Sequence, residues 1–248
     1  MLDQMSGGRF ELGVGRGISP YELAHAGVNF LESAEMYEEA LAVILAGLAG
    51  GPLTHRGRHY RYTNLPIELE PVQRPHPPLW QGVGTPPAAS AAARRGANIV
   101  GTAPNATLKT LVDAYFSARE GRANGEPTLV GAQRHVFVAG TDGQARDLAR
   151  GAYKVWYDSI SYLWRKFGSA PIRFAESLER ALAIDAAIVG SPATVRAELE
   201  RHVAETGVNY FVGRFIFGNL PHEQAHRSLE LFAREVMPHF QSPGGSHA

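Results

Sequence analysis

The spacing of apolar residues changes repeatedly along the chain, from every second residue to every third or fourth. Phe10, Leu12 and Val14 alternate with Glu11 and glycine, which predicts a short strand. Between residues 30 and 48 apolar side chains recur at three- and four-residue steps, which predicts an amphipathic helix. Downstream, the same reasoning predicts strands at 79–84, 98–101, 134–139 and 210–217, and helices at 86–95, 107–121, 142–157, 193–205 and 221–236. This alternation favours an α/β fold with about five parallel strands covered by helices.

Several segments interrupt the alternation. Residues 1–5 look like the last turn of a helix that ends at Gly7-Gly8, and residues 18–29 read as a loop. A hairpin is expected from alternation at 55–62 and again at 67–69, with its turn at Thr63-Asn64. Residues 158–187 are less regular, and residues 242–248 form a tail expected to be disordered.

Aromatic residues gather in and beside the irregular segment. Trp156, Tyr162 and Trp164 lie close together in the sequence. They fit either packing or a lid over an apolar organic substrate, because such insertions often carry binding residues.

Composition restricts the partners. The 248 residues include 24 basic and 24 acidic side chains, so the formal net charge is zero, and no nucleic-acid or anionic membrane partner is expected. The absence of cysteine excludes disulfides and thiolate chemistry. No apolar run is long enough for a membrane span, and a cytoplasmic location is expected.

The first strand ends in a glycine-rich segment with one guanidinium. Gly13, Gly15 and Gly17 allow a ligand to approach the backbone closely, and Arg16 offers donors that match phosphate oxygens. The G-x-G-x-G spacing is not the dinucleotide-binding fingerprint. A glycine-rich strand end with a solvated arginine is the alternative interpretation.

The strand at 79–84 ends in a similar way. Gly84 and Thr85 precede Pro86-Pro87, and the threonine is a good helix cap. A helix start with its positive dipole end attracts anions, although a plain capped helix explains the same residues. Ligands of parallel α/β folds bind at the carboxyl ends of strands, where both segments lie.

One motif invites a metal interpretation. His222-Glu223-Gln224-Ala225-His226 matches H-E-x-x-H, but it occupies the first turn of a terminal helix and has no marked third ligand. We therefore expect no metal. No nucleophile elbow and no phosphate-binding loop of the G-x-x-x-x-G-K-[ST] type occur.

Taken together, several segments resemble the luciferase-like, flavin-dependent monooxygenases. They follow the order of that family along nearly the whole chain. The matching segments are 6–17 (SGGRFELGVGRG), 32–41 (ESAEMYEEAL), 71–80 (PVQRPHPPLW), 92–96 (AARRG), 189–192 (VGSP) and 230–238 (ELFAREVMP).

The resemblance implies a (β/α)8 barrel of the TIM type that binds reduced FMN and uses O2 to oxygenate a small organic substrate. A separate flavin reductase would supply the reduced FMN. The cofactor-binding residues implied are Gly15, Arg16, Gly84 and Thr85. Relatives that use the deazaflavin F420 tend to have a small hydroxylated residue at the position of Arg16, so the FMN branch is the closer match.

The chain also departs from the family. Residue 1 aligns late in the third helix, so three β/α units, or about 90 residues at roughly 30 per unit, have no counterpart. The expected domain, 1–241, is then an incomplete barrel with exposed strand edges that favour a homo-oligomer. Its catalytic residues stay unknown. The alternatives are a non-catalytic flavin-binding or inactive barrel fragment, and an F420-dependent oxidoreductase that transfers hydride.

Overall fold

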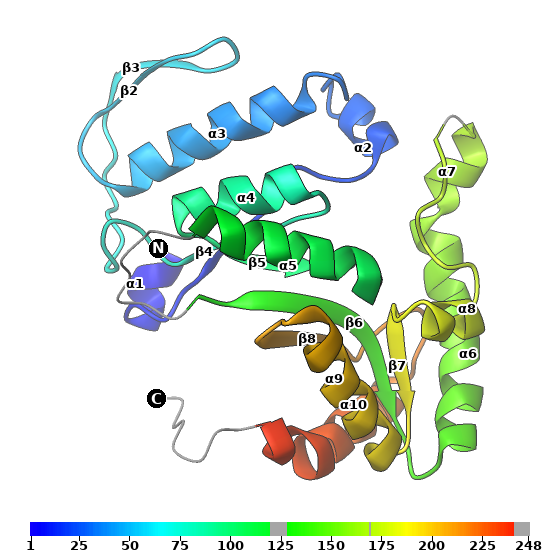
Figure 1. The fold of residues 1–248 in the computed structure, drawn as a ribbon. Coiled ribbons are helices and arrows are strands. Elements are labelled where there is room, and N and C mark those ends of the chain that lie inside the picture. Colours follow the sequence, from blue (N-terminus) through cyan, green and yellow to red (C-terminus); the bar gives the residue numbers. More distant parts are fainter. Residues whose placement is uncertain (120–127, 169, 241–248) are drawn as a thin grey trace.

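Six parallel strands form one sheet, and a two-stranded antiparallel hairpin lies outside it (Figure 1). The computed structural model describes residues 1–119, 128–168 and 170–240. The sheet strands are β1 (Leu12–Val14), β4 (Leu79–Gly82), β5 (Asn98–Gly101), β6 (Val130–Val138), β7 (Ala187–Gly190) and β8 (Tyr210–Arg214). The hairpin strands are β2 (Leu53–Arg56) and β3 (Arg61–Leu65). The predicted parallel α/β fold is confirmed.

The order of strands is organised by β6. The sheet runs β1, β4, β5, β6, and β8 then pairs with the free edge of β6. His135 is in register with Ala187 of β7 and with Arg214 of β8, so β7 and β8 lie on opposite edges of β6. Ala132 of β6 is likewise in register with residues of both β5 and β8, so these two strands also lie on opposite edges of β6. Strand β7 therefore continues the β5 edge further along β6, and the described part of the sheet stays open at β1, β7 and β8.

Helices connect the strands and cover the sheet. In chain order they are α1 (Leu2–Ser6), α2 (Pro20–His25), α3 (Ser33–Leu48), α4 (Pro86–Arg95), α5 (Asn105–Arg119), α6 (Asp142–Ile160), α7 (Tyr162–Phe167), α8 (Leu178–Ala183), α9 (Pro192–Thr206) and α10 (His222–Leu231). A π-helical turn (Phe232–Val236) and a 3-10 turn (Met237–Phe240) follow α10. In the described residues, no helix combines the length and the apolar character needed to cross a bilayer.

Three clusters of buried side chains hold these layers together. Helices α3, α4 and α5 pack on one face of β1, β4, β5 and the first part of β6. Helix α9 and the segment after α10 pack on the same face of the second part of β6 and on β7. Helices α6 and α8 cover the opposite face, but only at the carboxyl-terminal part of β6 and β7. The remainder of that opposite face is therefore left partly exposed.

Four elements of the sheet and its helices were not predicted: β7, α2, α7 and α8. Strand β7 has all four residues buried, so it shows no alternation of apolar and polar positions. Helix α2 lies in the segment expected to be a loop. Its Ser19 hydroxyl accepts a hydrogen bond from the Glu22 amide and Pro20 occupies the first turn, which is a recognisable start signal. The irregular 158–187 segment contains α7 and α8.

Other predicted boundaries differ from those in the structure or fall outside the described residues. Strand β6 begins at Val130, four residues before the expected start at Arg134, because β5 and β8 both pair with its first part. The end of the helix expected to reach residue 121 and the tail 242–248 lie outside the described residues.

The hairpin turn lies at Gly57–Tyr60 and not at Thr63-Asn64, because α3 binds it there. Glu39 accepts hydrogen bonds from the amides of Arg58 at 3.1 Å, His59 at 3.0 Å and Tyr60 at 2.7 Å. His55 Nε2 adds a contact of 3.1 Å to the same carboxylate. Partial burial by itself raises the pKa of Glu39, but these donors outweigh it and lower the pKa to about 2.

We predict that Glu39→Gln loosens the hairpin. Amide exchange at residues 58–60 should rise about ten-fold or more, and the melting temperature should fall by roughly 2–4 °C. The pKa of Glu39 is depressed in the folded state, so its contribution is present above about pH 4.5 and is lost as pH falls toward 2. The difference in urea midpoint between wild type and variant should therefore be smaller at pH 3 than at pH 7. Glu68→Gln, at an exposed position, serves as the control.

Candidate functional site

The partly exposed face of the sheet changes in character from one side to the other. Residues in register across parallel strands share a face, and the register links Gly13 to Trp80 and Gly82 to Gly131 through Val100. No atom lies within 4 Å of a Cβ built on Gly13 or Gly82, so bare backbone faces open space there. Along β6 and β8 the same face carries large and polar side chains, which are Gln133, His135, Tyr210, Val212 and Arg214.

Trp80 separates the glycine region from the polar one. Its ring packs on Tyr210 with centroids 5.0 Å apart, and its indole N–H donates to the Glu11 carboxylate. Gly131 lies next to the Trp80 ring and the Ile99 carbonyl. A Cβ at Gly131 would be in ordinary contact with Trp80 Cζ3 at 3.6 Å, but at 3.2 Å from the Ile99 carbonyl oxygen it would be closer than most real Cβ contacts.

The four predicted cofactor-binding residues lie at neighbouring strand ends. Gly15 and Arg16 follow β1, Gly84 and Thr85 follow β4, and these two strands pair in parallel. All four are exposed, and nothing lies within 4 Å of a Cβ at Gly15 or Gly84. The Arg16 guanidinium lies 5.4 Å from the Phe30 ring. Their role in binding a cofactor stays a prediction.

The start of α4 offers fewer donors than a typical helix N-terminus. Thr85 caps the helix as expected, accepting from the Ala88 amide at 3.4 Å, and its carbonyl accepts from the Ala89 amide. Pro86 and Pro87 have no N–H. The helix therefore contributes its dipole and not a set of free amide donors.

Sequence reasoning missed a cluster on β6 and β8. Arg214 Nη1 donates to His135 Nε2 at 3.2 Å, and Arg214 Nη2 donates to Gln133 Oε1 at 3.2 Å. His135 is buried, and its interaction with the Ala186 backbone slightly opposes the lowering of the His135 pKa. Because Nε2 accepts from Arg214, the proton of the neutral ring is on Nδ1. Burial, followed by the charge of Arg214, lowers the pKa of His135 to about 3.

The signal for this cluster in the sequence is incomplete. Gln133 and His135 are two residues apart and therefore share one face of β6, but Arg134 between them is also polar, so polar and apolar positions do not alternate there. The pairing of that face with Arg214 depends on the register of β6 and β8, which periodicity does not predict.

Aromatic rings continue from this cluster toward α2. Trp156 lies 4.2 Å from the His135 ring and 5.7 Å from Phe174, and Phe174 lies 5.9 Å from Trp164. Trp164 is buried against Tyr21 of α2, with centroids 5.8 Å apart. Of the three predicted lid aromatics, Trp164 is buried and Trp156 is partly buried among these rings, whereas Tyr162 is 53% exposed.

Two other groups of histidine and acidic side chains resemble metal sites, but their carboxylates already have partners within the protein. The H-E-x-x-H side chains are engaged on the surface of α10, with Glu223 paired to Arg227 at 2.5 Å and His226 to Glu230 at 3.4 Å. Their own helix therefore supplies the partners of the motif.

Within the described residues, Asp185, Glu198 and His202 lie close enough to share a metal ion. However, Arg201 Nη2 already contacts both carboxylates at 2.6 Å. Asp185 belongs to the loop before β7, and the other two residues belong to α9 on the helix-covered side, away from the exposed sheet face. The two carboxylates are therefore explained by an ion-pair network with Arg201, in which the buried His202 ring takes no part.

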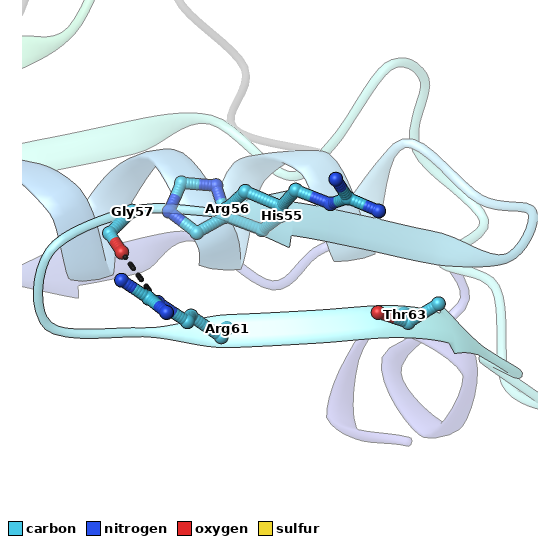
Figure 2. A pocket seen from close by; sticks show the side chains of 5 residues that line it. All are labelled: His55, Arg56, Gly57, Arg61 and Thr63. Carbon is cyan, nitrogen blue, oxygen red and sulfur yellow. Dashed lines mark hydrogen bonds between the residues drawn. The ribbon is translucent and has the colours of Figure 1, made fainter.

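A groove of about 450 Å³ runs along the hairpin, lined by His55, Arg56, Gly57, Arg61 and Thr63 (Figure 2). Figure 2 shows the Arg61 guanidinium turned toward the Gly57 carbonyl, to which Nε donates at 3.2 Å. The hairpin packs against α3, outside the sheet, so the groove is separate from the strand ends (Figure 1).

A known protein family matches most of the chain. The sequence profile of the luciferase-like monooxygenases matches residues 1–210. The chain belongs to this family. Its neighbours among solved structures share the TIM-barrel fold, and the family membership supports an oxidoreductase.

Three solved structures illustrate the relationship. Monooxygenase RslO1 of Streptomyces bottropensis is 25% identical, with a TM-score of 0.82 over 97% of this luciferase-like chain and 72% of that one. The oxygenating constituent of 3,6-diketocamphane monooxygenase of Pseudomonas putida, solved with FMN, is 22% identical, with a TM-score of 0.74 over 98% and 74%. The coenzyme F420-dependent tetrahydromethanopterin reductase of Methanopyrus kandleri is 21% identical, with a TM-score of 0.66 over 97% and 77%.

We predict that His135 stays neutral across the physiological range. Nitrogen NMR of the ring should show the proton on Nδ1 and no titration between pH 5 and 8. The pKa is depressed from about 6.5, so folding stability is lost as pH falls from 6.5 toward 3. Arg214→Met should raise the pKa of His135 only in part, since burial is the larger cause. A midpoint between pH 5 and 8 in the wild type would contradict this assignment.

Proposed function

We propose that this protein is an FMN-dependent monooxygenase that oxygenates a small organic molecule, with reduced FMN supplied by a separate flavin reductase. The observation that supports it most strongly is the open glycine surface beside two neighbouring strand ends. Gly13 and Gly82 leave room for a planar ring on the sheet, and Gly15 and Gly84 leave room beyond it. A flavin combines these two requirements, a flat ring system and an anionic phosphate.

The residues present fit such a cofactor. Arg16 is exposed at the end of β1, where its fork of donors suits a phosphate, and the dipole of α4 lies at the end of β4. Trp80 and Tyr210 border the glycine surface and supply an apolar edge for the ring. When bound, reduced flavin supplies the activation of O2.

The protein's own contribution is to bind, orient and exclude water. The aromatic rings around Trp156 close the α6 end of the face, where a substrate would be shielded from solvent. An apolar substrate body suits this end.

Use of F420 is the second candidate, because one similar fold is that of an F420-dependent reductase. In that case the chemistry would be hydride transfer. A guanidinium at the end of β1 suits a phosphate of either cofactor, so direct binding has to decide. A third outcome is a chain that binds flavin without catalysing a reaction.

Titration of the purified chain with FMN, riboflavin and F420, followed by fluorescence, tests the proposal. FMN should bind saturably and more tightly than riboflavin, which lacks the phosphate. Arg16→Ala should weaken FMN binding by roughly 10- to 100-fold, since a hydrogen bond between charged groups contributes about 1.5–3 kcal/mol. Gly84→Ala should also weaken it while the melting temperature stays unchanged, because its Cβ meets no protein atom.

The control is Arg227→Ala, which removes a guanidinium from the surface of α10. Its FMN affinity should equal that of the wild type. Tighter binding of F420 than of FMN would favour the second candidate. Equal FMN affinity in wild type and Arg16→Ala, with both folded, would contradict the placement of the phosphate at Arg16.

A further inference from the structure

Arg214 is a half-buried cation whose contacts are neutral. Its guanidinium donates to Gln133 Oε1 and His135 Nε2, and it lies 5.9 Å from the Trp156 ring. In the part of the chain that the structure describes, no carboxylate lies within ion-pair distance of it. Arg95, Arg150 and Arg201, by contrast, are each paired with an acidic side chain. Among the described residues, Arg134 also contacts only neutral groups, but it is 1% exposed and therefore out of reach of a ligand, whereas Arg214 is only half-buried.

This arrangement is electrostatically incomplete. Removing a cation from water without a counter-charge is unfavourable, and burial accordingly lowers the pKa of Arg214. The same charge helps to keep His135 neutral. An anion placed beside the guanidinium would offset the cost of burial, so the local environment is suited to a negatively charged ligand.

The residues around Arg214 also indicate the chemical character of the rest of the ligand. The Trp156 ring lies 5.9 Å from the Arg214 guanidinium, and Trp156 is only partly buried. Phe217 is buried 5.1 Å from the His135 ring, so the interior beside this group is apolar as well. A molecule that combines an apolar part with one anionic group would satisfy both features.

We propose that Arg214 binds a carboxylate or phosphate group of an organic ligand whose apolar part packs against Trp156. The inference rests on the proposed function in one respect, that the exposed sheet face is the ligand-binding face. It adds the chemical class of the ligand, an acidic organic molecule.

The anionic group has two possible sources, the substrate or the cofactor phosphate. Strand β8 is three strand steps from β4 and four from β1, which is about 14–19 Å along the sheet at about 4.8 Å per step. A phosphate bound at Arg16 and Thr85 therefore leaves Arg214 for a second anion. This separation favours a substrate carboxylate.

Binding of simple probes tests the proposal. Benzoate and hexanoate should bind at least ten-fold more tightly than benzamide and hexanamide, as followed by tryptophan fluorescence and by the NMR signals of the His135 ring. Arg214→Met should abolish this preference, whereas Arg214→Lys should retain part of it through its charge. Arg16→Ala and the surface control Arg227→Met should leave the preference unchanged. Melting curves establish that each variant is folded.

The remaining outcomes separate the sources and the two proposals. If Arg214→Met instead removes the preference for FMN over riboflavin, the anion is the cofactor phosphate. If FMN does not bind the wild type but the carboxylate preference depends on Arg214, the anion site stands and the proposed cofactor does not. If neither carboxylates, inorganic phosphate nor FMN shows binding that depends on Arg214, the proposal is overturned.

Discussion

The hydrogen bonding of β6 to three other strands is the constraint on which the rest of the structure depends. Its first part lies between β5 and β8, and its second part continues beside β7. Once β6 is in register, side-chain alternation sends Arg134, Val136 and Val138 to the helix side and Gln133 and His135 to the other. A shift of one residue would exchange these two sets.

The helix-covered side shows how closely this register is enforced. Arg134, which is 1% exposed, extends between α5 and α9 and donates to Asn105 Oδ1 at 3.1 Å. The guanidinium of Arg134 is held by two hydrogen bonds, from Nη1 to the Gln133 carbonyl and from Nη2 to the Asn105 side chain. Burial lowers the pKa of Arg134, and the charge of Asp185 opposes that shift. Such a buried cation is tolerated only where neighbouring elements meet it, so α5, α9 and β6 specify one another.

Much of this fold was predictable from local signals. Strand β5 and helix α4 have the expected bounds, because alternation, a Thr85 cap and Gly96 in a left-handed conformation (φ 75°) all agree. Strand β7 was missed because burial on both faces removes alternation, and the hairpin turn was misplaced because Glu39, distant in sequence, binds it. Tertiary contacts, which periodicity does not contain, decided both.

The candidate site divides in the same way. Glycine, cap and strand patterns placed Gly15, Arg16, Gly84 and Thr85 at the carboxyl ends of two strands, and the structure shows that these two strands are neighbours. The His135–Arg214 contact joins residues 79 apart in sequence and follows only from the β6–β8 register. The exposed face thus has a glycine side suited to a flat cofactor and a cationic, aromatic side suited to an acidic ligand.

Mapping of amide and indole chemical shifts on addition of FMN is the most direct test of where the cofactor binds. The account predicts that the largest changes occur at Gly13, Gly15, Gly82 and Gly84 and at the Trp80 indole, with little change in α9 or the hairpin. Changes concentrated around the hairpin groove at His55 and Arg61, with the strand-end glycines unaffected, would contradict it.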